Sequence, residues 1–254
     1  MTECPDSSRP FPLRTRASKF SIWNPPTIEL IGGHSLCPSI INEAPVVIDL
    51  GANRGEFTRA VIERFNAKVH AVEASPGLCS MLPHCPGCLC YNFAISGSCG
   101  REAFHLSSNS EANSRFKLHG FEYTHSIQVD AITLESLMAA GNISDADILK
   151  VDIEGSEIDM FASTADETIK KFQQITVEFH EWLEFGSATE VRKIIKRLKR
   201  LGFYHFTLVR GSFADVLFLS QREISLAQYY SMLLAVWVPR ILAHLRKRLS
   251  LFSQ

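Results

Sequence analysis

Short runs of aliphatic and β-branched residues alternate along the chain with segments whose apolar residues recur at helical spacing. The runs predict strands at residues 46–50, 68–73, 89–94, 148–153 and 174–179. Nearly continuous apolar character is typical of strands buried on both faces of a parallel sheet. Helices are predicted between and after them, at residues 55–65, 76–82, 133–140, 155–161, 165–171 and 188–201. This order predicts an α/β fold with a doubly wound, mostly parallel sheet and helices on both faces.

The remaining patterned segments are shorter. Residues 203–208 and 215–219 are predicted to be a closing pair of strands. Residues 95–125 are rich in Ser, Asn, Gly and His and are predicted to be irregular, except for an edge strand at 102–106. A short helix or strand is expected around residues 27–31.

Three sections are predicted along the chain. Residues 1–27 are rich in Pro, Ser and Arg and are expected to form a poorly ordered arm. Residues 28–220 form the α/β domain. Residues 221–254 form a tail in which an apolar helical stretch precedes a basic end. Packing on the domain, a homodimer contact and peripheral contact with a membrane surface all fit this tail.

Composition narrows the class of protein. Apolar residues make up 46% of the chain, charged residues 21%, and the formal net charge is -1. This balance is ordinary for a globular protein and does not indicate a nucleic-acid partner. The N-terminus lacks the apolar core of a signal peptide, and no segment reaches the ~20 apolar residues of a membrane-spanning helix. With an odd number of cysteines, seven, free thiols and a cytoplasmic location are expected.

A glycine-rich turn follows the first predicted strand. The segment is Val47-Ile48-Asp49-Leu50-Gly51-Ala52-Asn53-Arg54-Gly55, directly before a predicted helix. In a doubly wound fold, ligands bind beyond the carboxyl ends of the strands. Gly51 allows a sharp turn close to a ligand, and Gly55 allows the helix to begin near the strand. Asp49 can accept hydrogen bonds from loop amides or from a cationic ligand.

This turn differs from the dinucleotide fingerprint, which needs glycine where the chain has Asn53 and Glu56. A glutamate in the first helical turn would repel a diphosphate. A sulfonium cation with an amino-acid tail fits the turn better, and an NAD-dependent oxidoreductase is the less favoured alternative. Glu73, at the end of the second strand, can accept hydrogen bonds from both ribose hydroxyls and so indicates an adenosine ligand of either kind.

Charged residues alternate at the end of the fourth strand. Lys150, Asp152 and Glu154 are expected to share one face of it. Charges on an otherwise buried strand are costly unless they are paired or functional. Asp152 is the candidate for a catalytic base or for orienting an acceptor. Lys150 is expected to pair with Asp152 or to hold a deprotonated oxygen.

The fifth strand ends in a second polar pair, Glu178 and His180. His180 is a candidate general base near neutral pH, with a structural hydrogen bond as the equal alternative. These two residues together with Asp152 and Glu154 could bind a divalent ion. Pairing of the carboxylates with Lys150 explains the cluster without one, so no metal is expected. The Cys-x-x-Cys pair at residues 85–88 has no second pair to complete a zinc site.

Taken in order, these segments resemble the FkbM-type methyltransferases, a branch of the class I S-adenosylmethionine-dependent enzymes. The resemblance covers residues 46–219. It depends most on Ile148-Leu149-Lys150-Val151-Asp152-Ile153-Glu154-Gly155-Ser156-Glu157. The other contributing segments are residues 47–55, Val72-Glu73-Ala74-Ser75-Pro76, residues 129–134, and Val177-Glu178-Phe179-His180-Glu181.

The resemblance implies a Rossmann-like sheet of seven strands and S-adenosylmethionine as methyl donor. The acceptor would be a hydroxyl group of a small molecule or sugar. Glu73 would hold the ribose, and residues 93–95, with Ala94 at their centre, would flank the adenine. The residues implied at the methionine end are Asp49, Gly51, Asn53 and Gly55. A protein that keeps this fold for binding and has lost turnover is the alternative from another class.

Overall fold

We describe the fold from a computed structural model of the chain. The structure describes residues 25–84, 87–107, 113–116, 122–181 and 187–251, without the side chains of 239–251. Cys85, part of the Cys-x-x-Cys pair, and most of the predicted N-terminal arm lie outside the described residues.

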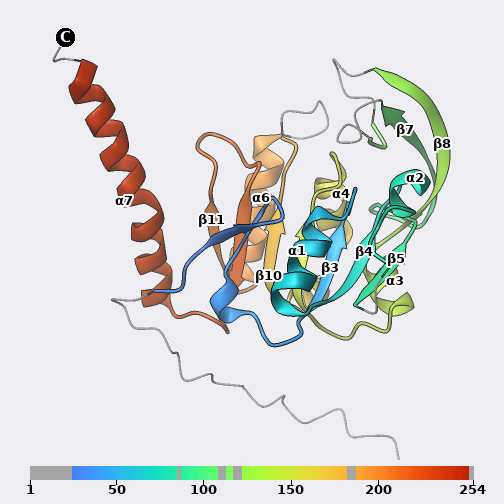
Figure 1. Cartoon of the computed structure of the whole chain (residues 1–254), viewed down its shortest axis with the longest axis horizontal. Helices are drawn as coiled ribbons and strands as arrows, with labels where there is room; N and C mark the ends of the chain where they lie inside the picture. Colours follow the sequence, from blue (N-terminus) through green and yellow to red (C-terminus); the bar gives the residue numbers. More distant parts are fainter. Residues whose placement is uncertain (1–24, 85–86, 108–112, 117–121, 182–186, 252–254) are drawn as a thin grey trace, which may run out of the picture.

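A seven-stranded sheet forms the centre of the molecule (Figure 1), which confirms the predicted fold class. Its spatial order is β11-β12-β10-β9-β3-β4-β5. The neighbours from β10 to β5 pair in parallel, whereas β12 is antiparallel to both β10 and β11. The bounds are β3 Val46–Leu50, β4 Lys68–Val72, β5 Cys88–Tyr91, β9 Ala146–Val151, β10 Phe172–Val177, β11 Phe203–Thr207 and β12 Val216–Ser220.

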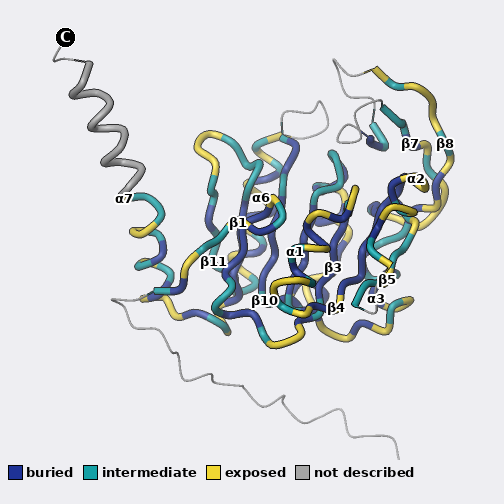
Figure 2. Tube along the Cα trace, viewed as in Figure 1, coloured by how far each residue is buried: buried dark blue, intermediate teal, exposed yellow. Residues whose placement is uncertain are grey.

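Helices cover both faces of this sheet, as the strand–helix alternation predicts. Successive residues of β3 point to opposite faces, because Val47 belongs to one buried cluster and Ile48 to another. Helix α1 packs in the first cluster, and α3, α4 and α6 pack in the second. The central strands are buried along almost their whole length (Figure 2). The helix bounds are α1 Glu56–Phe65, α2 Pro76–Cys79, α3 Leu134–Ala140, α4 Glu157–Ser163, α5 Asp166–Ile169 and α6 Ala188–Arg200.

A second sheet, of three strands, confirms the edge strand predicted at residues 102–106 and corrects the prediction that the rest of residues 95–125 is irregular. It consists of β6 Ala94–Ile95, β7 Gly100–Ser107 and β8 Tyr123–Ile132 in the order β6-β8-β7. Strand β8 went unrecognised because only Val129 and Ala131 along it are buried, so it has little apolar signal. Residues 89–94 are likewise not one strand, because β5 ends at Tyr91 and the chain then enters the second sheet.

A short hairpin precedes the domain. Strands β1 Glu29–Ile31 and β2 His34–Leu36 pair in antiparallel fashion, and the 3-10 turn η1 Pro38–Ile40 follows. A buried side chain of β10 fixes the hairpin to the sheet, because Gln174 accepts a hydrogen bond from the Cys37 N–H (2.8 Å) and donates one to the Cys37 carbonyl (3.1 Å). This attachment brings His34 to the carboxyl end of the central strands.

The C-terminal tail contains one long helix, α7 Leu226–Leu251 (Figure 1). Met232 is buried against the outer strands, and the ring of Tyr229 stacks on Tyr204 with 4.4 Å between centroids. Among the described residues, no helix has the length and apolar character needed to cross a membrane.

Candidate active site

The turn after β3 is held in an unusual backbone conformation. Gly51, Asn53 and Gly55 all have positive φ angles, of 79°, 49° and 78°. Asparagine tolerates this region better than most residues with a side chain. A Cβ atom on Gly51 would lie 1.7 Å from the carbonyl oxygen of Asp152. The turn therefore packs directly against the backbone that follows β9.

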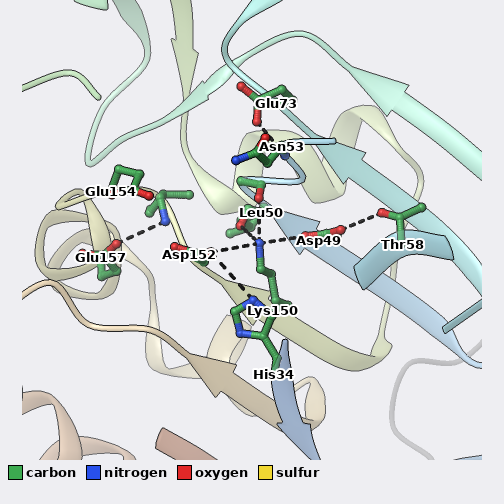
Figure 3. Close-up of polar contacts among 12 residues, drawn as sticks. His34, Asp49, Leu50, Asn53, Thr58, Glu73, Lys150, Asp152, Glu154 and Glu157 are labelled. Carbon is green, nitrogen blue, oxygen red and sulfur yellow. Dashed lines mark hydrogen bonds and ion pairs between the residues drawn. The ribbon is translucent and has the colours of Figure 1, made fainter. Parts of the chain in front are cut away.

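Lys150 ties this turn to the same segment (Figure 3). Its ammonium group donates to the carbonyl oxygens of Gly51 (2.6 Å) and Leu50 (3.2 Å). It also pairs with Asp49 Oδ1 at 3.2 Å and Asp152 Oδ2 at 3.6 Å. Burial lowers the pKa of Lys150, but the two carboxylates outweigh it and the net pKa is raised. Of the two roles predicted for Lys150, pairing with Asp152 is observed. Its ammonium group is already bonded to protein oxygens.

Two of the residues predicted at the methionine end of the cofactor, Asp49 and Gly55, do not line a cleft. Asp49 is completely buried, and its second oxygen accepts a hydrogen bond from Thr58 on α1 (2.6 Å). Gly55 precedes α1, and a Cβ atom there would lie 2.9 Å from Pro83. Neither residue lines the two clefts described below. Both residues instead support the conformation of the glycine-rich turn.

The first of the two clefts, which we call the apolar cleft, has an empty volume of about 560 Å³. Phe93, Ala94, Ile95 and Phe104 supply much of its apolar wall, and Glu73 lies at its edge. Ala94 and its two neighbours, predicted to flank the adenine, thus line this cleft.

Glu73 is held rigidly beside the apolar cleft. Its carboxylate oxygens accept hydrogen bonds from the backbone N–H groups of Asn53 and Ser75, each at 2.8 Å. Burial raises the pKa of Glu73, and the two backbone hydrogen bonds only partly oppose this. Because each carboxylate oxygen has two acceptor positions, Glu73 can still accept hydrogen bonds from a ligand.

A second opening, which we call the polar cleft, adjoins the first. Its charged and imidazole lining consists of His34, Arg54, Glu56, Lys150, Asp152, Glu154 and Glu178. The two clefts share Gly51, Asn53, Asp152 and Glu154. Asp152 therefore lies on the wall between an apolar compartment and a charged one.

Unsatisfied polar atoms mark this shared wall. Asn53 Oδ1 and Asp152 Oδ1 are buried and, within the described part of the chain, accept no hydrogen bond. A buried acceptor without a donor is costly, so these two atoms are well suited to accept hydrogen bonds from a ligand. The cofactor implied by the resemblance has hydroxyl and ammonium donors and a positive sulfur, which suit an amide oxygen and a carboxylate. The residues present therefore fit that group.

His180 lies between two glutamates. Its Nδ1 is 2.9 Å from Glu157 Oε1, and its Nε2 is 3.1 Å from Glu154 Oε2. Burial lowers the pKa of His180, but the hydrogen bonds to Glu154 and Glu157 raise it to about 11. Both ring nitrogens are thus engaged by carboxylates, which is the structural arrangement given as the alternative to a general base, and the general-base role stays a prediction.

The predicted alternation of Lys150, Asp152 and Glu154 along one strand face is wrong at its last member. Strand β9 ends at Val151, and Glu154 has a left-handed backbone with φ of 49°. The backbone N–H groups of Ile153 and Gly155 both donate to Glu157 Oε1 at 3.1 Å, which fixes this turn. Glu154 lines the clefts because of the conformation of this turn, and not because it continues the alternation of the strand.

Two residues of the polar cleft were not among the predicted catalytic residues. Burial raises the pKa of Glu178 to about 7, and the charge of Asp152 adds to the rise. Burial lowers the pKa of His34 to about 4, with Lys150 contributing. Glu178 was recognised from sequence as part of the polar pair that ends the fifth strand and as a possible ligand of a divalent ion, but not as a catalytic residue. His34 had no sequence signal, because its position depends on where the hairpin docks.

The sheet with its single antiparallel strand β12, and a glycine-rich turn facing two joined clefts, define a class I methyltransferase domain of Rossmann-like fold. The family model described as methyltransferase FkbM domain matches residues 49–204. The chain belongs to this family, as the sequence resemblance predicted.

The solved structures that the chain resembles have low sequence identity to it. Precorrin-6y C5,15-methyltransferase from Geobacter metallireducens is 8% identical, with 71% of this chain and 81% of that chain covered and a TM-score of 0.37. The fibrillarin pre-rRNA processing protein of Methanococcus jannaschii is 11% identical, with 75% and 68% covered and a TM-score of 0.39. A TehB-like methyltransferase from Corynebacterium glutamicum is 9% identical, with 72% and 82% covered and a TM-score of 0.33. No curated protein matches the sequence significantly. The family assignment therefore depends on the matched domain.

Proposed function

We propose that this methyltransferase uses S-adenosylmethionine and transfers the methyl group to a hydroxyl oxygen of a small molecule or sugar. The observation that carries the proposal is the position of Asp152, on the wall shared by the apolar cleft and the polar cleft. A donor bound on one side and an acceptor bound on the other would meet at this carboxylate.

The apolar cleft supplies the groups that would hold the donor. Phe93, Ala94 and Ile95 would flank the adenine, and the free acceptor positions of Glu73 would take the ribose hydroxyls. Asn53 would hold the methionine end through its unsatisfied side-chain oxygen. When bound, S-adenosylmethionine supplies a methyl group activated by a positively charged sulfur.

Asp152 would orient the acceptor and receive its hydroxyl proton. An alcohol must lose this proton as its oxygen is methylated, so a positioned carboxylate assists. The ammonium group of Lys150, 3.6 Å away, fixes the direction of the Asp152 carboxylate. Holding the reacting groups in line supplies much of the rate of such a displacement.

A thermal-shift comparison of S-adenosylmethionine, S-adenosylhomocysteine and NAD tests the cofactor. A ligand that binds only the folded state raises its stability by about 2.7 kcal/mol at 100 times its Kd. We expect both S-adenosyl compounds to raise the melting temperature and NAD to leave it unchanged. Stabilisation by NAD alone would overturn the proposal, and stabilisation by none would favour a fold kept for binding.

The substitution Asp152→Asn tests the chemistry. We expect it to retain binding of S-adenosylmethionine and to lower methyl transfer by about 10²- to 10⁴-fold, the usual contribution of a positioned proton acceptor. The assay would follow S-adenosylhomocysteine formation with a panel of sugars, alcohols and phenols. Asp130→Asn is the matched control, because that carboxylate lies on β8 and is 65% exposed. Unchanged transfer by Asp152→Asn would remove this residue from the mechanism.

A further inference from the structure

The polar cleft contains more negative charge than its cations compensate. Lys150 is shared between Asp49, Asp152 and two carbonyl oxygens. The ring of His180 is held by Glu154 and Glu157. Glu178 forms no ion pair in the described part of the chain, although it lines the same cleft as Asp152. The cleft is thus lined by four carboxylates, Glu56, Asp152, Glu154 and Glu178, and by two side-chain cations, Arg54 and Lys150.

His34 is an imidazole without a hydrogen bond, aimed at these carboxylates. Only 8% of the residue is exposed, and it makes no hydrogen bond to any described residue. Its Nε2 points toward Asp152 (Figure 3) and lies 3.7 Å from Oδ2, beyond hydrogen-bonding distance. The His34 ring packs edge-on against Phe57. A buried imidazole whose ring nitrogens make no hydrogen bond can bind a metal ion through one of them.

We propose that His34, Asp152 and Glu178 bind one divalent metal ion of the Mn²⁺ class. One ligand atom from each of the three residues can be chosen so that all lie within 4.8 Å of one another. One imidazole nitrogen and two carboxylate oxygens form a mixed donor set that suits such an ion, with the remaining positions left to water or substrate. The residues lie at the ends of three separate elements, β2, β9 and β10.

The nearby group of Asp152, Glu154 and His180 is the weaker candidate, although its ligand atoms also lie within 4.8 Å of one another. Both ring nitrogens of His180 already bind carboxylates, so the ring has no free nitrogen for a metal. The two Asp152 oxygens face different ways, Oδ2 toward His34 and Oδ1 toward His180. The metal therefore belongs on the His34 side.

The absence of a metal was predicted from sequence because Lys150 was expected to neutralise the carboxylates. In the structure Lys150 pairs with Asp49 and Asp152 and bonds the backbone of the glycine-rich turn, but within the described residues it forms no ion pair with Glu178. Open positions of an ion at His34 would face the polar cleft, where an acceptor oxygen would bind. This last role depends on the proposed function, whereas metal binding itself does not.

The test is a titration of Mn²⁺ into the metal-free full-length protein, followed by the electron paramagnetic resonance signal of the free ion. We expect a single saturable site. Substituting even residues that only support metal ligands typically weakens affinity by 10- to 100-fold. His34→Gln and Glu178→Gln should each cause at least about that loss. His70→Gln is the matched control, because His70 is also 8% exposed but is hydrogen-bonded to Tyr91 (2.9 Å).

Three outcomes would overturn the proposal: no saturable binding by the wild-type protein, unchanged binding by both variants, or loss of binding in His180→Gln alone. If His34→Gln fails to fold, electron spin echo on the wild-type complex still decides whether an imidazole nitrogen is bound to Mn²⁺, and Glu178→Gln assigns the site. Because the readout is metal binding, failure here differs visibly from failure of S-adenosylmethionine to bind.

Discussion

At the scale of single residues, the active site depends on a contact between two backbone segments. Gly51 and the carbonyl of Asp152 approach so closely that no side chain fits between them. Lys150 then bonds the Gly51 carbonyl and the Asp152 carboxylate together. The turn that would hold the donor and the carboxylate that would hold the acceptor are thereby one rigid unit.

The substitution Gly51→Ala tests this contact. The added Cβ would lie 1.7 Å from a backbone oxygen and would also require a positive φ of 79°. We expect a loss above about 4 kcal/mol, the range reached only by severe structural conflicts. Thermal unfolding would measure it, because each kcal/mol lowers the Tm by about 2–4 °C at this chain length.

Gly33→Ala is the control for Gly51→Ala. Gly33 has a similar φ of 89°, but a Cβ there would meet nothing within 4 Å. The substitution Gly33→Ala should therefore lower the free energy of unfolding only by the strain of a left-handed backbone conformation, about 1–2 kcal/mol. Equal losses in the two variants would contradict the idea that the Asp152 carbonyl excludes a side chain at position 51.

At the scale of elements, the helices and the buried strands follow the apolar pattern closely. In α6, the side chains of Val191, Ile194, Ile195 and Leu198 are buried on one face, as predicted. Strand β8 was not predicted from its apolar pattern, because few of its residues are buried. Apolar spacing detects an element only when burial on one face is what stabilises it.

Helix α7 combines a packed side with an exposed one. Met232 is 1% exposed against the outer strands, whereas Leu234 is 63% exposed. We expect Met232→Ala to cost about 2–5 kcal/mol, as for other buried methionines. Leu234→Ala should stay within about 0.5 kcal/mol, because it removes few contacts. Chemical denaturation of both variants would measure the difference, and similar costs would contradict the docking of α7.

The exposed side of α7 includes Leu226, Tyr230, Leu234 and Val238, spaced four residues apart. Such a stripe suits contact with a second copy or with a membrane surface. Both contacts remain predictions for the tail.

At the scale of the whole molecule, the N-terminal hairpin and β10 are joined across 137 positions of sequence. The amide of Gln174 is completely buried and satisfies both the N–H and the carbonyl of Cys37. This pair of hydrogen bonds holds the hairpin that places His34 in the polar cleft.

The substitution Gln174→Ala should destabilise the protein by about 1–3 kcal/mol, because it leaves the buried Cys37 N–H without a partner, whereas the Cys37 carbonyl keeps its hydrogen bond from the Ile40 N–H (3.3 Å). Gln173→Ala is the neighbouring control. The Gln173 side chain is only half-buried, and its oxygen has no hydrogen-bond partner in the described structure. Urea unfolding would compare the two, and an equal loss would show that the hairpin is not held by Gln174.

The sequence alone determined those features that depend on local pattern. Strand and helix order followed from apolar spacing, and the ligand edge of the sheet followed from the polar residues at strand ends, Glu73 and Asp152 among them. The methyltransferase family followed from the ordered motifs that these strand ends contain.

Only the tertiary structure decided which groups meet and what charge they bear. Lys150 donates a hydrogen bond to the backbone of the glycine-rich turn, and His180 lies between two glutamates. His34 lies beside Asp152 because of the position of the N-terminal hairpin, which had no recognisable sequence signal. These outcomes depend on burial and on distances between residues far apart in sequence. Protonation and metal affinity respond to those distances, which residue order along the chain does not contain.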